Sequence, residues 1–127
     1  MGLEKLPTFE EKNSQFRMRL EQLQDEQLAS KKEQRRVEEQ QEAFFELQQQ
    51  EQVVYHSVLS NCEPEERAFI EELGEDSLRL AKNAKLEFDE ELLQLKKEER
   101  LLLDQEEAIL QEQQSFLKES KEDEHGT

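Results

Sequence analysis

The sequence predicts an all-α fold, a long antiparallel two-helix hairpin of coiled-coil type with its turn near residues 60–63. Residues that favour helices dominate the chain, namely Glu, Gln, Leu, Lys and Arg. Helix breakers are scarce, with 3 Gly and 2 Pro among 127 residues. Apolar residues recur every seven positions in both halves of the chain, and this repeat is typical of helices that pack with knobs in holes.

The composition limits how much core such a hairpin can have. Charged residues make up 39% of the chain and hydrophobic residues 33%. An average domain is about a quarter charged and about half apolar. Low hydrophobicity with a net charge of −16 also favours disorder, but disordered chains are usually richer in Gly, Pro and Ser. We therefore expect two helices joined by a thin apolar seam.

The first helix is expected from about residue 8 to residue 59. Steps of seven residues through it give mostly apolar positions: Phe9, Phe16, Leu23, Ser30, Val37, Phe44, Glu51 and Val58. This spacing places one apolar stripe along the helix.

The second helix is expected from Pro64 to about residue 119. Proline suits the first helical position because its missing N–H has no partner there, and the acidic residues that follow suit the positive end of the helix dipole. Steps of seven give six apolar positions: Ala81, Phe88, Leu95, Leu102, Ile109 and Phe116. Gly74 could kink the helix, with Asp76 or Ser77 as a new N-cap. Residues 120–127 are expected to fray, and residues 1–127 to form one elongated domain.

The two helices do not match along their whole length. Folding the hairpin about Cys62 sets residue i roughly opposite residue 124 − i, which pairs Phe44 with Leu80. The polar, basic stretch 29–36 then faces an apolar stretch of the second helix that contains Phe88, Leu92, Leu93 and Leu95. The first helix alone would not cover that stretch.

A second apolar stripe adds to this surplus. Successive helical residues point about 100° apart, so one partner helix cannot cover the whole run Leu101-Leu102-Leu103. We expect a third helix, from another copy or from a different protein, although single exposed apolar residues are also common. The predicted partner-binding residues are Phe45, Phe88, Leu92, Leu93, Leu101, Leu103, Leu110 and Leu117.

No catalytic, cofactor-binding or metal-binding motif is visible, so we expect a protein that is not an enzyme and has no cofactor. His56 and Cys62 lie six residues apart across a turn, without a third group to orient them. The acidic charge argues against binding nucleic acid or an anionic membrane. Residues 61–127 carry 21 acidic and 9 basic groups, so a partner with a basic face would suit this half.

The chain is expected in the cytoplasm. Its single cysteine, Cys62, cannot form an internal disulfide, which fits a reducing compartment. The first residues lack the apolar segment of a signal peptide. The longest aliphatic run is three leucines, far too short to span a membrane.

The layout of the helices also resembles a known family. The patterns that carry the resemblance are Glu42-Ala43-Phe44-Phe45-Glu46-Leu47, Glu66-Arg67-Ala68-Phe69-Ile70-Glu71-Glu72-Leu73, and Leu92-Leu93-Gln94-Leu95 through Leu101-Leu102-Leu103-Asp104 to Ile109-Leu110. They resemble the small LXG-associated α-helical proteins of Gram-positive type VIIb secretion systems, which are long relatives of WXG-type hairpins. The resemblance covers about residues 9–118. It implies a chaperone and targeting factor that binds the N-terminal helical LXG domain of a toxin, and that could be co-exported with it.

The chain departs from the wider WXG pattern in two ways. It has no Trp, so the Trp-x-Gly turn is missing. It also lacks an aromatic residue followed four places later by an acid, because Ser120 follows Phe116 and Leu59 follows Tyr55. A second small helical protein could supply that export signal. Two other functions remain open at this point: a self-assembling coiled-coil protein that forms homo-oligomers, and a hairpin of the export-ATPase stalk type.

Overall fold

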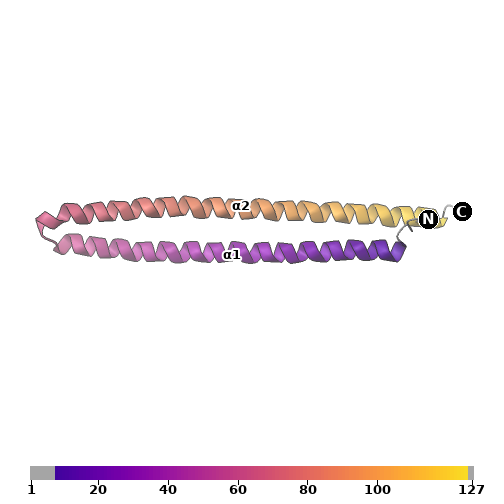
Figure 1. Ribbon diagram of the computed structural model, residues 1–127, viewed down its shortest axis with the longest axis horizontal. Coiled ribbons are helices and arrows are strands. Elements are labelled where there is room, and N and C mark those ends of the chain that lie inside the picture. Colours follow the sequence, from indigo (N-terminus) through magenta and orange to yellow (C-terminus); the bar gives the residue numbers. More distant parts are fainter. Residues whose placement is uncertain (1–7, 126–127) are drawn as a thin grey trace, which may run out of the picture. The chain divides into compact units, whose positions relative to one another are not determined.

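Two helices make up nearly all of the fold. The computed structural model describes residues 8–125, with side chains described as far as residue 121. Helix α1 spans Phe9–Asn61 and helix α2 spans Pro64–His125, and no strand occurs between residues 8 and 125 (Figure 1). The predicted all-α helical hairpin is confirmed.

The second helix is longer than predicted. It continues to His125, whereas the sequence led us to expect fraying from residue 120. The segment after residue 117 is rich in Lys and Glu, which are good helix formers, and this composition outweighs its lack of apolar residues. Residues 126–127 of the predicted tail lie outside the described part of the chain.

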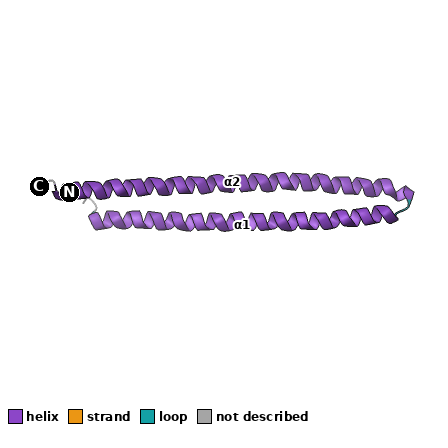
Figure 2. Ribbon diagram, turned by 180° about the vertical axis from the view of Figure 1, so that it is seen from behind, coloured by secondary structure: helices purple, strands orange, loops and turns teal. Residues whose placement is uncertain are grey.

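The chain packs as two compact units. Of the described residues, one unit, here called the terminal unit, contains 8–31 and 97–125, and the other, the turn unit, contains 32–96. Within each unit a segment of α1 lies beside an antiparallel segment of α2, as the ribbon in Figure 2 shows. The partly buried positions of both segments follow steps of three and four residues, so each unit has one seam between its helices.

A capping box starts α1. The backbone N–H of Glu11 donates to the Thr8 hydroxyl at 3.2 Å, and the N–H of Thr8 donates to the Glu11 carboxylate at 3.4 Å. This reciprocal pair satisfies two N–H groups that have no partner inside the helix. The sequence pattern Thr-x-x-Glu that precedes an apolar run is its signature.

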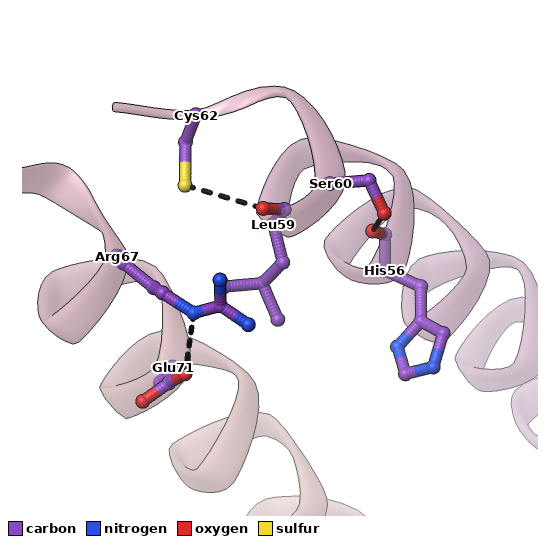
Figure 3. Close-up of polar contacts among 6 residues, drawn as sticks. All are labelled: His56, Leu59, Ser60, Cys62, Arg67 and Glu71. Atoms are coloured by element: carbon purple, nitrogen blue, oxygen red, sulfur yellow. Dashed lines mark hydrogen bonds and ion pairs between the residues drawn. The ribbon is translucent and has the colours of Figure 1, made fainter. Parts of the chain in front are cut away.

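The turn between the helices is short. Only Cys62 and Glu63 lie outside the helices here, and Pro64 takes the first position of α2 as predicted. The side chain of Ser60 donates to the backbone oxygen of His56 at 3.0 Å, and the Cys62 thiol donates to the backbone oxygen of Leu59 at 3.5 Å (Figure 3). Leu59 belongs to the last turn of α1, where backbone oxygens are left without helical partners, and the thiol donates to one of them.

The terminal unit has an aromatic and aliphatic core. Phe16, Leu23 and Ile109 are buried, and Leu20, Leu102 and Phe116 pack against them. The Phe116 ring lies 5.3 Å from the Phe9 ring and 5.8 Å from the Phe16 ring, measured between centroids. Aromatic pairs at these distances add stability beyond the apolar area they bury.

The turn unit has a thinner seam. Val37 and Ala81 are its buried apolar residues, and Phe44 contacts Phe88 with ring centroids 5.9 Å apart. Beyond Ile70, the next seam positions of α2 carry small side chains: Gly74, Ser77, Ala81 and Ala84. Because small residues bury little apolar area, this part of the seam contributes less hydrophobic stabilisation than the core of the terminal unit.

The register between the helices differs from the predicted one. Phe44 contacts Phe88, eight positions beyond the Leu80 that we expected opposite it. Tyr55 lies against Gly74, and Gln27 donates to the Glu106 carboxylate at 2.7 Å. Every side chain from residue 64 to residue 69 is exposed, so none of them packs in the seam. The first turns of α2 therefore pass the end of α1 before the seam begins.

The corrected register removes one of the two reasons for expecting a third helix. Val37 is fully buried, and Phe88, Leu92 and Leu95 are partly buried in the seam. Phe88 contacts Phe44, and in this part of the turn unit Val37 is the fully buried residue of α1. The other reason for expecting a third helix was the second row of apolar residues beside the seam. That reason remains.

The predicted stripes were correct for α2 and partly wrong for α1. All six predicted positions of α2 are buried or partly buried. In α1 the stripe holds from Phe16 through Phe44, but Phe9, Glu51 and Val58 are exposed. Gln52 and Leu59 take the seam positions near the turn. A helix with 3.6 residues per turn drifts from a seven-residue repeat, and one additional four-residue step returns the seam to the interface.

Gly74 does not break α2. The helix continues through it, and no glycine between residues 8 and 125 has a positive φ. A Cβ atom added there would lie 3.9 Å from the Tyr55 ring, which is ordinary van der Waals contact. Asp76 bonds the Arg79 side chain three residues later and caps no new helix.

Candidate protein-binding surfaces

The predicted partner-binding residues fall into two groups. Phe88 and Leu92 lie in the seam of the turn unit and are partly buried. The others lie beside a seam position, either exposed or half-buried: Phe45, Leu93, Leu101, Leu103, Leu110 and Leu117. Of these, Phe45 packs edge-on against Phe44, with 5.8 Å between the ring centroids.

In the terminal unit, three of the predicted leucines share one flank of α2. Leu103, Leu110 and Leu117 each follow a seam residue by one position, and they are spaced seven apart. Leu103 is 51% exposed and Leu110 is 41% exposed, whereas Leu117 is half-buried. We call these three residues the leucine stripe. Leu101 precedes the seam residue Leu102, so it lies on the opposite flank and is not part of the stripe.

The turn unit has a different surface, which the sequence-based prediction missed. A groove of about 470 Å³ runs between its two helices. Both helices line it, with Phe44, Leu47, Gln48, Glu51 and Tyr55 from α1 and Leu73, Asp76, Ser77, Leu80 and Ala81 from α2. Leu47 and Leu80 are 65% and 69% exposed, although they line a concave surface. We call this surface the turn groove.

The exposed apolar residues on the side of the turn unit where the turn groove lies have mirrored spacing in the two helices. Those of α1 are Leu47, Val54 and Val58, with steps of seven and four, and those of α2 are Phe69, Leu73 and Leu80, with steps of four and seven. Since Tyr55 lies against Gly74, the antiparallel register sets these residues roughly opposite one another, within about two residues: Leu47 with Leu80, Val54 with Leu73, and Val58 with Phe69. The sequence contains this signal, but reading it requires the correct register.

Two carboxylates lie within the turn groove. Glu51 and Asp76 both line it, and the register set by Tyr55 and Gly74 places them roughly opposite each other between two of the apolar pairs. Partial burial raises the pKa of Tyr55 above its ordinary value of 10.0, and a hydrogen bond with Glu51 and the negative charges of both carboxylates raise it further. These carboxylates give the lining of the turn groove a negative charge.

A wider hollow in the terminal unit has a different character. It encloses about 710 Å³, and most of its lining is charged or carries amide groups. Arg19 and Glu112 form an ion pair of 3.0 Å across it. Both partners are more than half exposed, and exposed pairs of this kind stabilise little. This hollow offers no apolar anchor outside the core residues at its base.

The other residues considered from the sequence are not assembled into a reactive site. The imidazole of His56 points away from Cys62 (Figure 3). Within residues 8–125, no three His, Cys, Asp or Glu side chains are grouped so that they could hold a metal ion. No helix in that part of the chain is long and apolar enough to cross a membrane.

Comparisons with known proteins give no match, whether to protein-family models, to curated proteins or to solved structures. The resemblance to LXG-associated proteins therefore rests on the quoted sequence patterns alone.

Proposed function

We propose that this protein is a non-enzymatic helical adaptor that binds the N-terminal helical LXG domain of a toxin and targets it for type VIIb secretion. The observation that carries the proposal is the leucine stripe, a row of three apolar side chains on a flank of α2, of which Leu103 and Leu110 remain exposed. A partner helix with its own apolar stripe would bury these leucines between polar flanks. The sequence resemblance supplies the identity of the partner.

The size of the hairpin core also supports a partner. The buried apolar residues are few, while most of the large apolar side chains between residues 8 and 121 remain exposed or half-buried. Rows of exposed apolar side chains commonly mark protein-binding surfaces. In this proposal the adaptor acts in the cytoplasm, where it covers a helix of its cargo. A second small helical protein carries the export signal that this chain lacks.

Co-purification from cells that express the native gene neighbours tests the proposal. We expect tagged wild-type protein to recover, in near-stoichiometric amount, a larger protein with a helical N-terminal region. Leu103→Asp and Leu110→Asp should each reduce that recovery at least about tenfold, because a charge would be buried in the new interface. Far-UV circular dichroism should show unchanged helicity in both variants.

Met18→Asp is the matched control, because Met18 is 66% exposed on α1 of the same unit and lies outside the leucine stripe. It should leave recovery unchanged. Equal recovery by all three variants would disprove the role of the leucine stripe. Recovery of this chain alone, as a defined oligomer, would favour the self-assembling coiled coil instead.

A further inference from the structure

The turn groove differs from the leucine stripe in place and in charge. It lies in the turn unit, both helices form it, and carboxylates lie among its apolar residues. The leucine stripe belongs to one helix of the terminal unit and contains no charged residue of its own. An occupant of the turn groove meets two carboxylates as well as apolar side chains, and within the protein Asp76 pairs with Arg79 while Glu51 bonds Tyr55.

The weak seam beneath the groove adds a reason for an occupant. Between Gly74 and Ala84, α2 presents only small residues to the seam, and α1 presents Gln48, Gln52 and Tyr55, while Ile70 and Leu59 are the larger apolar seam residues next to the turn. The amide nitrogen of Gln52 is buried without a hydrogen-bond partner. The large apolar residues of this region instead lie on the groove flank, where solvent reaches them. A helix laid along the flank would bury apolar area that the hairpin itself leaves exposed.

The charge of the region decides what kind of helix fits. Residues 46–80 contain nine acidic and two basic side chains. A second copy of this chain would bring like charge against this surface. Its most basic stretch, residues 31–36, has no apolar side chain that could enter the groove. A basic helix from another protein would bring opposite charge against this surface and could also carry apolar side chains that enter the groove.

We propose that the turn groove is a docking site for a basic amphipathic helix of another protein. Two apolar side chains of that helix, seven positions apart, cover the pairs Leu47–Leu80 and Val54–Leu73. A Lys or Arg between them meets Glu51 and Asp76, which line the groove roughly opposite each other between those two pairs. The site is separate from the leucine stripe, and its occupation does not depend on the secretion role proposed above.

The protein carries its own reporter for this site. Tyr55 lines the groove, it is the single tyrosine of the chain, and there is no tryptophan. Intrinsic fluorescence excited in the tyrosine band therefore reports the turn groove and not the leucine stripe. A peptide without tyrosine or tryptophan can be titrated into the full-length protein without a label.

The probe is a helical peptide of about 20 residues, stapled because short isolated helices are marginal in water. It carries two leucines seven positions apart, an arginine between them, and lysines on its outer face. We expect it to change Tyr55 fluorescence with saturable, micromolar affinity. A matched peptide with glutamate in place of that arginine should bind about tenfold more weakly, because it sets a third carboxylate beside the two in the groove.

Protein variants separate a specific site from general attraction to an acidic chain. Glu51→Gln with Asp76→Asn should weaken the arginine peptide about fivefold to tenfold and should largely remove its preference over the glutamate peptide. Glu21→Gln with Asp104→Asn makes the same change of net charge on exposed residues of the terminal unit, and it should alter affinity less than about twofold. Leu80→Ser should also weaken binding about tenfold.

The opposite results would overturn the inference. These are equal binding of the two peptides, equal effects of the two double variants, or no fluorescence change with the arginine peptide. If the protein alone forms a dimer that Leu80→Ser dissociates in sedimentation experiments, the occupant is a second copy and the basic-helix assignment is wrong. Unaltered toxin recovery by Leu80→Ser would leave the adaptor role intact, so failure of one proposal is distinguishable from failure of the other.

Discussion

The terminal unit and the turn unit consist of segments of the same two helices but place their large apolar side chains differently. In the terminal unit, phenylalanine, leucine and isoleucine fill the seam. In the turn unit, small and amide side chains take much of the seam, and several large apolar residues lie beside it. The comparison teaches that a regular apolar repeat can stabilise a hairpin in one region and present a binding surface in another.

The largest expected difference between the units concerns their aromatic residues. Phe16→Ala should lower the free energy of unfolding by about 3 kcal/mol, because Phe16 is 4% exposed and its removal leaves a cavity in the core. Phe44→Ala should cost about half as much, since Phe44 is only partly buried. Urea unfolding followed by circular dichroism measures both. Equal losses of stability would show that the two seams stabilise the protein equally. Met18→Ala, at an exposed position, is the control and should leave the free energy of unfolding nearly unchanged.

A polar seam residue gives the next largest effect. Gln52→Leu should raise the free energy of unfolding by about 1–2 kcal/mol, because it removes a buried amide nitrogen without a partner and adds apolar contact. Gln50→Leu makes the same chemical change at an exposed position and should alter stability by less than about 0.5 kcal/mol. A loss of stability in Gln52→Leu would mean that this glutamine stabilises the turn unit.

The glycine in the seam of the turn unit gives a smaller effect. Gly74→Ala should raise stability by about 0.5–1 kcal/mol, because alanine favours helix and its Cβ fits against Tyr55. Gly74→Leu should instead destabilise the protein, since the longer side chain must displace the Tyr55 ring. Thermal unfolding of the two variants checks this. Stabilisation by both would show that the helices approach less closely here than the structure indicates.

The smallest effect is the ionisation of Tyr55. Its phenol should lose its proton above pH 10.0, the ordinary pKa, because partial burial and the carboxylates of Glu51 and Asp76 disfavour the phenolate. The folded state holds the proton more tightly than the unfolded chain. The resulting stabilisation is complete below about pH 10 and is lost as the pH rises through the folded pKa.

Ultraviolet absorbance of tyrosinate measures that titration. Asp76→Asn should move the pKa of Tyr55 downward, because one of the nearby negative charges is removed. An unchanged titration in this variant would place Asp76 too far from Tyr55 to contribute to the charge of the turn groove.

The sequence by itself determined the local structure. Helix-forming residues, the scarcity of Gly and Pro, and Pro64 after a short polar turn set both helices and the place where the chain reverses. The seven-residue repeat also identified the seam of α2 correctly, and the run at residues 101–103 identified flanks that one helix cannot cover. These features depend on neighbours within a few turns, so a single sequence is enough to read them.

Only the tertiary structure decided the register, the change of seam position after Phe44, and the pairing that forms the turn groove. Each of these depends on how two helices settle against each other. The first turns of α2 pass the end of α1, and this shifts every later pair by several residues. No local propensity records that offset, because it arises from the packing of residues far apart in the chain. That Leu47 of α1 lies roughly opposite Leu80 of α2 can be seen only once the offset is known.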